Sequence, residues 1–236
     1  MGAILTYNNV LWLAFVLVDL AVAVAVFRLF GKHGLVALVV ASVIMANVQV
    51  TKSVVLFGLT ATLGNALYGS VFFATDILSE VYGRQEARRC VWLGFLTMAL
   101  VILWMSFCLS FVPGPFDLAH ESLMQVFGFL PRIALGSLVA YLVSQHHDIS
   151  SFHFWRRRTQ GRHLWLRNCA STMVSQAIDS VLFCFIALWG VYPPGAWLEI
   201  LLTTYVLKWV VALLDTPFIY LAVRLKPSDL PTTDSR

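Results

Sequence analysis

The sequence predicts an all-α integral membrane protein, built as a bundle of about seven transmembrane helices. Three observations support this prediction. Of the 236 residues 59% are hydrophobic, only 12% are charged, and the 16 Lys and Arg residues fall almost entirely into every second gap between long apolar runs. A soluble domain carries about 25% charged residues. Because basic residues collect in cytoplasmic loops, the alternation predicts that the N-terminus lies outside and the C-terminus inside.

Most of the apolar runs are long enough to cross roughly 30 Å of hydrocarbon as a helix. They lie at about 10–27, 34–51, 66–82, 91–111, 122–145, 168–190 and 197–223. These runs leave no room for a soluble domain, so residues 1–226 are expected to form one transmembrane domain and residues 227–236 a disordered cytoplasmic tail. The basic residues that fill the first, third and fifth gaps and follow the last run are Arg28, Lys32, Arg84, Arg88, Arg89, Arg156, Arg157, Arg158, Arg162, Arg167, Arg224, Lys226 and Arg236.

Two connections differ from short polar loops. Residues 145–167 are polar and basic with interspersed aromatic side chains, which predicts a cytoplasmic segment that lies among the lipid headgroups. Residues 52–65 are apolar but rich in glycine and threonine, which predicts an irregular re-entrant or lid segment. The net charge of +4 is explained by loops that face anionic lipids, so no nucleic-acid partner is expected.

Six ionisable residues lie inside the apolar runs. Each costs roughly 2.5–3.5 kcal/mol at the centre of a membrane helix unless it is paired or faces water. These side chains are therefore expected to face the interior, where they neutralise each other or a ligand. They form either a pathway for a polar small molecule or a set of ion pairs that only holds the bundle together. The six are Asp76, Glu80, Arg132, Asp179, Lys208 and Asp215.

The spacing of these residues favours a shared site. Asp76 and Glu80 lie four residues apart, on one face of the third helix. The polar residues of the sixth helix and the ionisable residues of the seventh also fall on single faces, and Pro217 predicts a kink in the seventh. Candidate substrate-binding residues are Asn47, Gln49, Asp76, Glu80, Asn168, Gln176, Asp179 and Asp215; candidate charge partners or gating residues are Lys52, Arg132 and Lys208; and candidate stacking residues are Tyr68, Phe72, Trp189 and Tyr205.

Three segments carry a resemblance to a known family. The stretches TDILSEVYGR (75–84), STMVSQAID (171–179) and YVLK through DTPFIY (205–220) resemble the queuosine precursor transporters of the vitamin uptake transporter family. The resemblance extends from about Ala46 to Leu225. It implies import of 7-cyano- and 7-aminomethyl-7-deazaguanine for tRNA modification, or of queuine or a nucleoside in some relatives. It also implies a multi-pass protein of the bacterial plasma (inner) membrane, similar in fold to the substrate-binding subunits of energy-coupling-factor transporters.

The candidate site suits that substrate class. Carboxylates and amides match a planar ring that presents several N–H donors and a carbonyl. Asp179 or Glu80 is expected to bind the ring N–H and exocyclic amine, and Gln176, Asn47 or Asn168 the carbonyl and N7-side groups. The other buried carboxylates would offset an aminomethyl cation, and the buried bases would hold carboxylates ionised or act as gates.

Other functions are less well supported. The chain has no Walker A motif, so it is expected either to work alone or to capture a substrate, including another vitamin or nucleobase, for a separate ATPase module. An intramembrane enzyme is the weaker alternative, because His146, His147 and His153 lack the spacing of a metal site. Neither a metal nor a cofactor is expected. The partners are the deazaguanine substrate and the lipid bilayer, and a homodimer and an energy-coupling module are left open.

Overall fold

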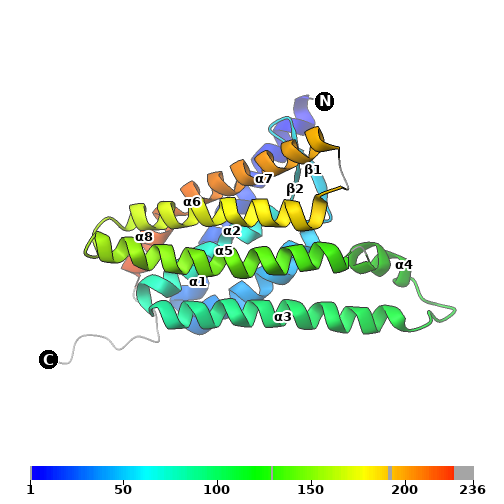
Figure 1. Cartoon of the computed structure of the whole chain (residues 1–236), viewed down its shortest axis with the longest axis horizontal. Coiled ribbons are helices and arrows are strands. Elements are labelled where there is room, and N and C mark those ends of the chain that lie inside the picture. Colours follow the sequence, from blue (N-terminus) through cyan, green and yellow to red (C-terminus); the bar gives the residue numbers. More distant parts are fainter. Residues whose placement is uncertain (1, 129, 191–192, 226–236) are drawn as a thin grey trace.

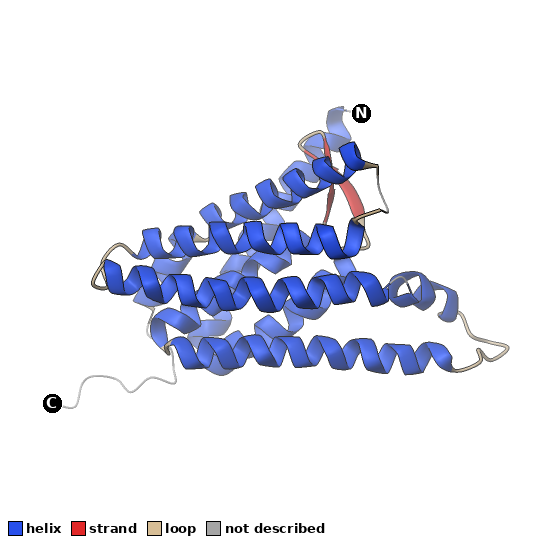
Figure 2. Cartoon of the chain, viewed as in Figure 1, coloured by secondary structure: helices blue, strands red, loops and turns tan. Residues whose placement is uncertain are grey.

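The computed structural model describes residues 2–128, 130–190 and 193–225 as a bundle of helices with one small β-hairpin (Figures 1 and 2). Within these residues, four helical stretches are long and apolar enough to cross a membrane: Tyr7–Gln49, Arg84–Ser110, Leu164–Leu188 and Pro194–Arg224. The prediction of a helical membrane protein is therefore confirmed. The expected disordered tail, residues 227–236, lies outside the described residues.

The elements follow the predicted runs closely. The helices are α1 (Gly2–Gln49), α2 (Gly64–Val81), α3 (Arg84–Ser110), α4 (His120–Leu123), α5 (Leu130–Arg158), α6 (Leu164–Phe183), α7 (Pro194–Leu214) and α8 (Thr216–Arg224). Two π-helical turns, Met124–Gly128 and Cys184–Leu188, precede α5 and follow α6. The strands are β1 (Ser53–Leu56) and β2 (Leu59–Thr62).

Helix α1 contains two antiparallel halves. A straight helix of its 48 residues would be about 70 Å long, more than twice the hydrocarbon thickness. Gly31 has φ 55° and ψ −137°, which breaks the helix at the gap predicted between the first two runs. The Oδ1 atom of Asn9 accepts a 2.8 Å hydrogen bond from the Phe57 N–H, and Gln49 lies four residues before the hairpin that contains Phe57. Both ends of α1 therefore lie beside the hairpin.

The hairpin at residues 52–65 corrects the expectation of an irregular segment there and of a fold without strands, whereas a re-entrant or lid role for this segment stays a prediction. Its strands are antiparallel, with Ser53 opposite Thr62. The two turn residues, Phe57 and Gly58, have φ values of 52° and 83°. Positive φ at both central positions is the type I′ geometry that matches the twist of paired strands. The β-branched residues on both sides of this turn favour strands, because they pack well on a pleated surface.

Helix α5 corrects a second expectation. Residues 146–158 continue this helix instead of forming a separate interfacial segment. No Gly or Pro occurs between Ser137 and Arg158, so nothing in the sequence ends the helix there. The chain turns at Gln160, Gly161 and His163, which all have positive φ. The predicted kink in the last helix is confirmed, since α7 ends at Leu214 and α8 begins with Pro217 in its first turn.

The segments rich in basic residues meet at one end of the bundle. Lys32 Nζ lies 3.6 Å from Glu86 Oε2, which joins the turn of α1 to the start of α3. Arg84 donates a 3.0 Å hydrogen bond to Ser150 on α5. The Trp165 N–H, at the start of α6, donates to the Tyr220 hydroxyl of α8. We call this the basic end, and the opposite end, where Asn9 contacts the hairpin, the hairpin end.

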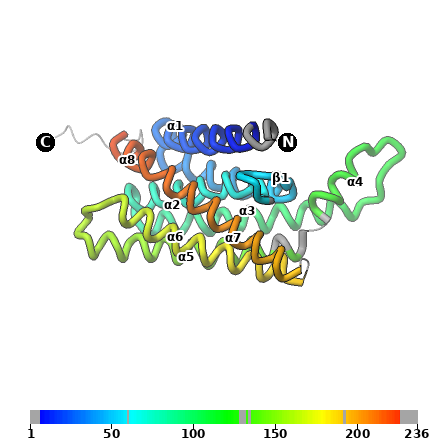
Figure 3. The backbone as a smooth tube through the Cα atoms, turned by 90° about the horizontal axis from the view of Figure 1, so that it is seen from above, coloured from blue at the N-terminus to red at the C-terminus, as the bar shows by residue number. Residues whose placement is uncertain are grey.

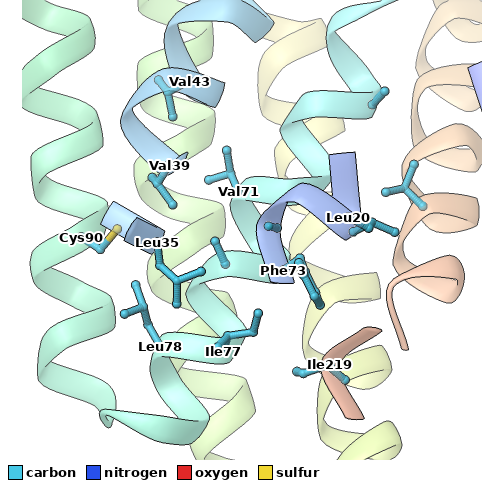
Figure 4. Packing of buried hydrophobic residues seen from close by; sticks show 14 of the residues in the cluster. Leu20, Leu35, Val39, Val43, Val71, Phe73, Ile77, Leu78, Cys90 and Ile219 are labelled. Atoms are coloured by element: carbon cyan, nitrogen blue, oxygen red, sulfur yellow. The ribbon is translucent and has the colours of Figure 1, made fainter. Parts of the chain in front are cut away.

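Helix α2 forms the centre of the molecule, and every residue from Val71 to Ser79 is buried. In Figure 3, α1 runs along one side of the bundle, and α5 and α6 run along the other. Figure 4 shows Leu35 and Val39 of α1 beside Val71 and Leu78 of α2. This apolar packing fixes the axial position of α2, and so of its polar residues.

Candidate functional site

A partly open cavity with a volume of ≈ 50 Å³ lies towards the hairpin end. Residues of α1, α2, α5, α6 and α7 and Thr62 of β2 line it. A volume of this size holds a few water molecules. The polar and charged side chains around the cavity include Asn47, Asn65, Tyr68, Asp179, Thr204 and Lys208.

An ion pair between Asp179 on α6 and Lys208 on α7 forms one wall of this cavity. The Lys208 ammonium donates to Asp179 Oδ2, and the two side chains are only 5% and 3% exposed. Asp179 Oδ1 accepts hydrogen bonds from the Tyr68 hydroxyl at 3.0 Å and from the Ser144 hydroxyl at 3.1 Å. Three donors, from α2, α5 and α7, therefore hold the Asp179 carboxylate in place.

Tyr68 joins this ion pair to the neighbouring aromatic side chains. Lys208 Nζ lies 4.7 Å from the centroid of the Tyr68 ring, a cation–π contact. The same ring makes edge contacts with Phe72 and Tyr141. Tyr68 is thus the predicted stacking residue that lines the cavity, whereas Phe72 is buried behind it. Tyr205 is half-buried and is not among the lining residues.

Amide side chains supply the neutral polar groups. Asn47 donates from Nδ2 to the Val43 carbonyl at 2.8 Å, and Asn65 donates to the Thr62 carbonyl at 3.3 Å. Their side-chain carbonyl oxygens are thereby left as acceptors. Gln176 lies one turn from Asp179 on α6, is 1% exposed, and has no hydrogen-bond partner on either amide atom within the described residues.

Close helix contacts set the width of the cavity. A Cβ atom on Gly64 would lie 2.5 Å from the Ala46 carbonyl oxygen, and one on Gly69 would lie 2.3 Å from Val211 Cγ1. Small residues permit membrane helices to approach closely. These two glycines of α2 allow α1 and α7 to pack tightly, which brings Lys208 near Asp179.

The π-helical turn after α6 holds two predicted residues away from the cavity lining. Arg132 is exposed and donates to the carbonyls of Ile186, at 2.7 Å, and Trp189. It was expected to be a charge partner or gating residue, but both of these hydrogen bonds are to backbone carbonyls at the end of a helical segment, which lack helical partners. Trp189 is 50% exposed and stacks on Phe185 with ring centroids 4.9 Å apart.

Two other predicted residues lie at a separate groove. The groove has a volume of ≈ 440 Å³ and lies between the first half of α1 and the hairpin. Gln49 and Lys52 line it together with Trp12, and Lys52 is exposed. They are therefore located at the rim of the hairpin end, outside the lining of the cavity that contains Asp179 and Lys208.

A second polar group lies further towards the basic end. Asp76 of α2, Asp148 of α5 and Asp215 at the α7–α8 junction are at most 1% exposed, and each is within electrostatic range of the others. We call these three residues the carboxylate cluster. Thr172 donates to Asp76 Oδ2 at 3.1 Å, and Asn168 donates to Asp215 Oδ1 at 2.7 Å. Within the described residues no Lys, Arg or His forms an ion pair with any of the three.

Glu80 belongs to a third group, at the basic end itself. Arg167 of α6 binds its carboxylate through two contacts, Nε–Oε2 at 3.1 Å and Nη2–Oε1 at 2.6 Å. Arg167 also donates to the carbonyl of Gly161, and Arg156 donates to the carbonyl of Glu80. This network ties the α5–α6 turn to the end of α2.

Sequence reasoning therefore found most of the polar residues but expected one shared site. The structure brings Asn47, Tyr68, Asp179 and Lys208 together at the cavity. Asp148 was not predicted as a site residue, because residues 145–167 were assigned to a segment among the lipid headgroups. Had α5 been continued beyond residue 145, Asp148 would have fallen on the same face as Ser144, four residues earlier. The pairing of Arg167 with Glu80 had no signal in the sequence, because the residues are 87 positions apart.

Comparison with known proteins places the chain in a family. Residues 62–222 match the family model described as "Putative vitamin uptake transporter". The chain belongs to the vitamin uptake transporter family. Within the matched region of this family lie Tyr68, Asp179 and Lys208, as well as the carboxylate cluster. Asn47 lies before it.

Curated relatives of the vitamin uptake transporter family cover most of the chain. A protein of Bacillus subtilis (strain 168) named "Probable queuosine precursor transporter" is 44% identical over 224 residues, which are 94% of this chain and 98% of the relative. The "Queuosine precursor transporter" of Escherichia coli (strain K12) is 31% identical over 69% of this chain and 72% of the relative. A Haemophilus influenzae relative is 27% identical over 56% of this chain and 53% of its own length. No solved structure gives a significant match.

Proposed function

We propose that this protein is a transporter, not an enzyme, and that it imports queuosine precursors across the bacterial inner membrane. The name carried by relatives from three bacteria supports this assignment, because the Bacillus subtilis relative matches over nearly the whole of both chains. The proposed substrates are 7-cyano- and 7-aminomethyl-7-deazaguanine, with queuine as a further candidate. The precursors would serve tRNA modification.

The proposed topology has seven spans. The two halves of α1 count as two, and α2, α3, α5, α6 and the α7–α8 pair supply the others. The basic end faces the cytoplasm, since basic loops are retained on that side. The hairpin end and the cavity beneath it then face the outside. A fold similar to the substrate-binding subunits of energy-coupling-factor transporters is part of the same proposal.

The observation that carries the proposal is the buried pair of Asp179 and Lys208 at the cavity wall. A deazaguanine ring presents a carbonyl next to N–H donors, so it needs a hydrogen-bond donor and acceptors side by side. Lys208 uses one N–H on Asp179, which leaves others for the ring carbonyl. Asp179, with the oxygens of Asn47 and Asn65, accepts from the ring N–H and amino groups. Charge-assisted hydrogen bonds of this kind favour one ring orientation.

Binding requires the cavity to widen. A bicyclic ring is larger than a cavity that holds only a few water molecules. The wall contributed by Thr62 belongs to the hairpin, which is connected to α1 and α2 by short segments. We assign the opening motion to this hairpin, and the ring stacks on Tyr68 once it has entered. Loop movements that enclose a bound substrate are common in proteins that must exclude water.

Ligand-dependent stability tests the proposal. Detergent-purified protein is melted with 7-cyano-7-deazaguanine, 7-aminomethyl-7-deazaguanine, queuine, guanine and adenine. A ligand at 100 times its dissociation constant adds about 2.7 kcal/mol to the stability of the folded state. We expect a rise for the deazaguanines that Asp179→Asn abolishes and that Asp117→Asn, in the exposed loop before α4, leaves intact. A flat response to every deazaguanine would refute the assignment.

A transport measurement defines the partners. The purified chain is reconstituted into lipid vesicles, and exchange of labelled 7-cyano-7-deazaguanine is followed. Exchange by the chain alone supports a self-sufficient transporter. Exchange that appears only after an ATPase module is added would favour a capture subunit. The mass of the protein–detergent particle, measured by light scattering, decides between a monomer and a homodimer.

A further inference from the structure

The carboxylate cluster contains negative charge that the described residues do not balance. Asp76, Asp148 and Asp215 are buried close enough to interact electrostatically, and within the described residues Asp76 Oδ1 and both oxygens of Asp148 have no hydrogen-bond partner. The surrounding charged groups are already paired: Glu80 with Arg167, and Asp179 with Lys208. Three ionised carboxylates without a counter-charge are strongly disfavoured in a buried site. At least one must therefore carry a proton.

The hydrogen bonds of α6 leave room for that proton on the pair of Asp76 and Asp148. Three residues of α6 that carry hydroxyl groups, Ser171, Thr172 and Ser175, lie beside this pair. Each hydroxyl has a single proton, and each proton is donated to a group other than Asp148: to the Asn168 carbonyl, to Asp76 Oδ2 and to the Ser171 carbonyl. In the part of the chain that the structure describes, neither carboxylate oxygen of Asp148 has a hydrogen-bond partner. A proton on either carboxylate of the pair can be donated to the other, which satisfies both groups.

The residues around Asp76 and Asp148 can also stabilise this pair when both carboxylates are ionised. Gln145 and Asn168 are fully buried; the Nε2 atom of Gln145 and the Oδ1 atom of Asn168 have no partner within the described residues. Gln145 is placed by a 3.0 Å hydrogen bond from Thr75, the residue before Asp76. Rotation of the α6 hydroxyls and donation from Gln145 would solvate the carboxylates after the proton leaves. A site for reversible protonation needs hydrogen-bond partners for the protonated form and for the ionised form.

The cluster is connected to the candidate substrate site through α6. Gln176 lies three residues from Asp179 and four from Thr172, which donates to Asp76. Its amide is buried and has no partner, so it is free to bond on either side. His147, the neighbour of Asp148, contacts the Ser175 hydroxyl at 3.0 Å. One row of α6 side chains, Asp179, Gln176 and Thr172, therefore connects the cavity to the carboxylate cluster.

We propose that Asp76 and Asp148 form a proton-binding site that couples substrate import to inward movement of a proton. The inference depends on the transport function proposed above. A proton from the outside bonds to one carboxylate oxygen of the pair, the substrate and proton cross together, and the O–H bond ionises towards the cytoplasm. One proton per neutral substrate permits about tenfold accumulation for each unit of pH difference.

Vesicle transport tests this coupling. Purified protein is reconstituted, and labelled 7-cyano-7-deazaguanine is supplied outside at a pH one unit below the lumen. We expect accumulation that a protonophore abolishes, together with acidification of the lumen reported by a trapped pH dye. Asp148→Asn, which resembles the protonated carboxyl group in shape, is expected to retain substrate exchange within about threefold of the wild type while its accumulation ratio falls to one. Asp117→Asn is the matched control and should behave as the wild type.

The outcomes separate the two proposals. Exchange without any response to the pH difference, or accumulation driven by a sodium gradient and insensitive to the protonophore, would overturn proton coupling and leave the transport function standing. Absence of exchange and of ligand stabilisation in the wild type would overturn the transport function itself. If Asp148→Asn does not yield folded protein, Asp76→Asn takes its place with the same expected loss of accumulation, and lumen acidification by the wild type tests the coupling itself.

Discussion

Lys208 and Asp179 form an ion pair inside the bundle, where their side chains are only 5% and 3% exposed. Removing both charges from water has a large free-energy cost, which the pair recovers only while both partners are present. The hydrogen bonds from Tyr68 and Ser144 hold the carboxylate in place. The pair is thus a structural contact between α6 and α7, and in the function proposed above it is also the group that binds the polar ring.

Loss of either partner should destabilise the protein strongly. Asp179→Ala or Lys208→Met alone leaves an unpaired buried charge, and we expect each to lower the free energy of unfolding by about 3–5 kcal/mol. The double variant should lose less than the sum, because no charge is left unpaired. Unfolding of the four proteins of this double-mutant cycle in detergent measures the coupling. Additive losses would show that the two side chains do not interact.

The Tyr68 hydroxyl and ring should contribute separately. Tyr68→Phe removes the hydrogen bond to Asp179 but keeps the ring against Lys208, so we expect a stability loss of about 0.5–1.5 kcal/mol. Tyr68→Leu also removes the cation–π contact and should cost more. The same thermal melts, repeated with 7-cyano-7-deazaguanine, should show weaker ligand stabilisation for Leu than for Phe. Equal behaviour of the two variants would argue against a stacking role.

The Glu80–Arg167 pair should hold the α5–α6 turn against the end of α2. Arg167→Met leaves Glu80, which is 13% exposed, with only the Arg156 contact at 3.9 Å. We expect destabilisation of about 3 kcal/mol and faster proteolysis at the α5–α6 turn, because breaking a buried pair leaves a charge without a partner. The variant Glu80→Gln/Arg167→Met should recover part of the stability. An unchanged rate of proteolysis would show that the pair does not hold the α5–α6 turn in place.

Gly69 should tolerate no side chain unless its neighbour shrinks. The Cβ atom of alanine at this position would lie 2.3 Å from Val211 Cγ1, so Gly69→Ala is expected to cost about 1–3 kcal/mol. Adding Val211→Ala removes the clashing atom and should restore part of the loss. Gly195→Ala, where the added atom meets nothing within 4 Å, is the control. Similar melting temperatures for Gly69→Ala and Gly195→Ala would disprove the tight contact.

Some features of the protein could be predicted from local sequence. Long apolar runs, separated by basic residues in alternate gaps, predicted the helices and the common location of the basic segments. The break at Gly31 and the interruption before Pro217 were also predictable, because both residues act on their own backbone. The hairpin was not predicted, since a short apolar segment with a Phe57-Gly58 turn lacks the usual Asn-Gly or Asp-Gly signal.

Composition and the cost of exposing a charge to lipid were enough to predict a membrane protein in which Asp76, Glu80, Asp179, Lys208 and Asp215 face the interior. The same argument was wrong for Arg132, which is exposed. The partners of the buried residues depend on the tertiary structure. Helical periodicity gives the face on which a residue lies, but not the depth and rotation at which two helices meet. The depth and rotation of the packed helices bring Asp179 to Lys208 and Asp148 to Asp76.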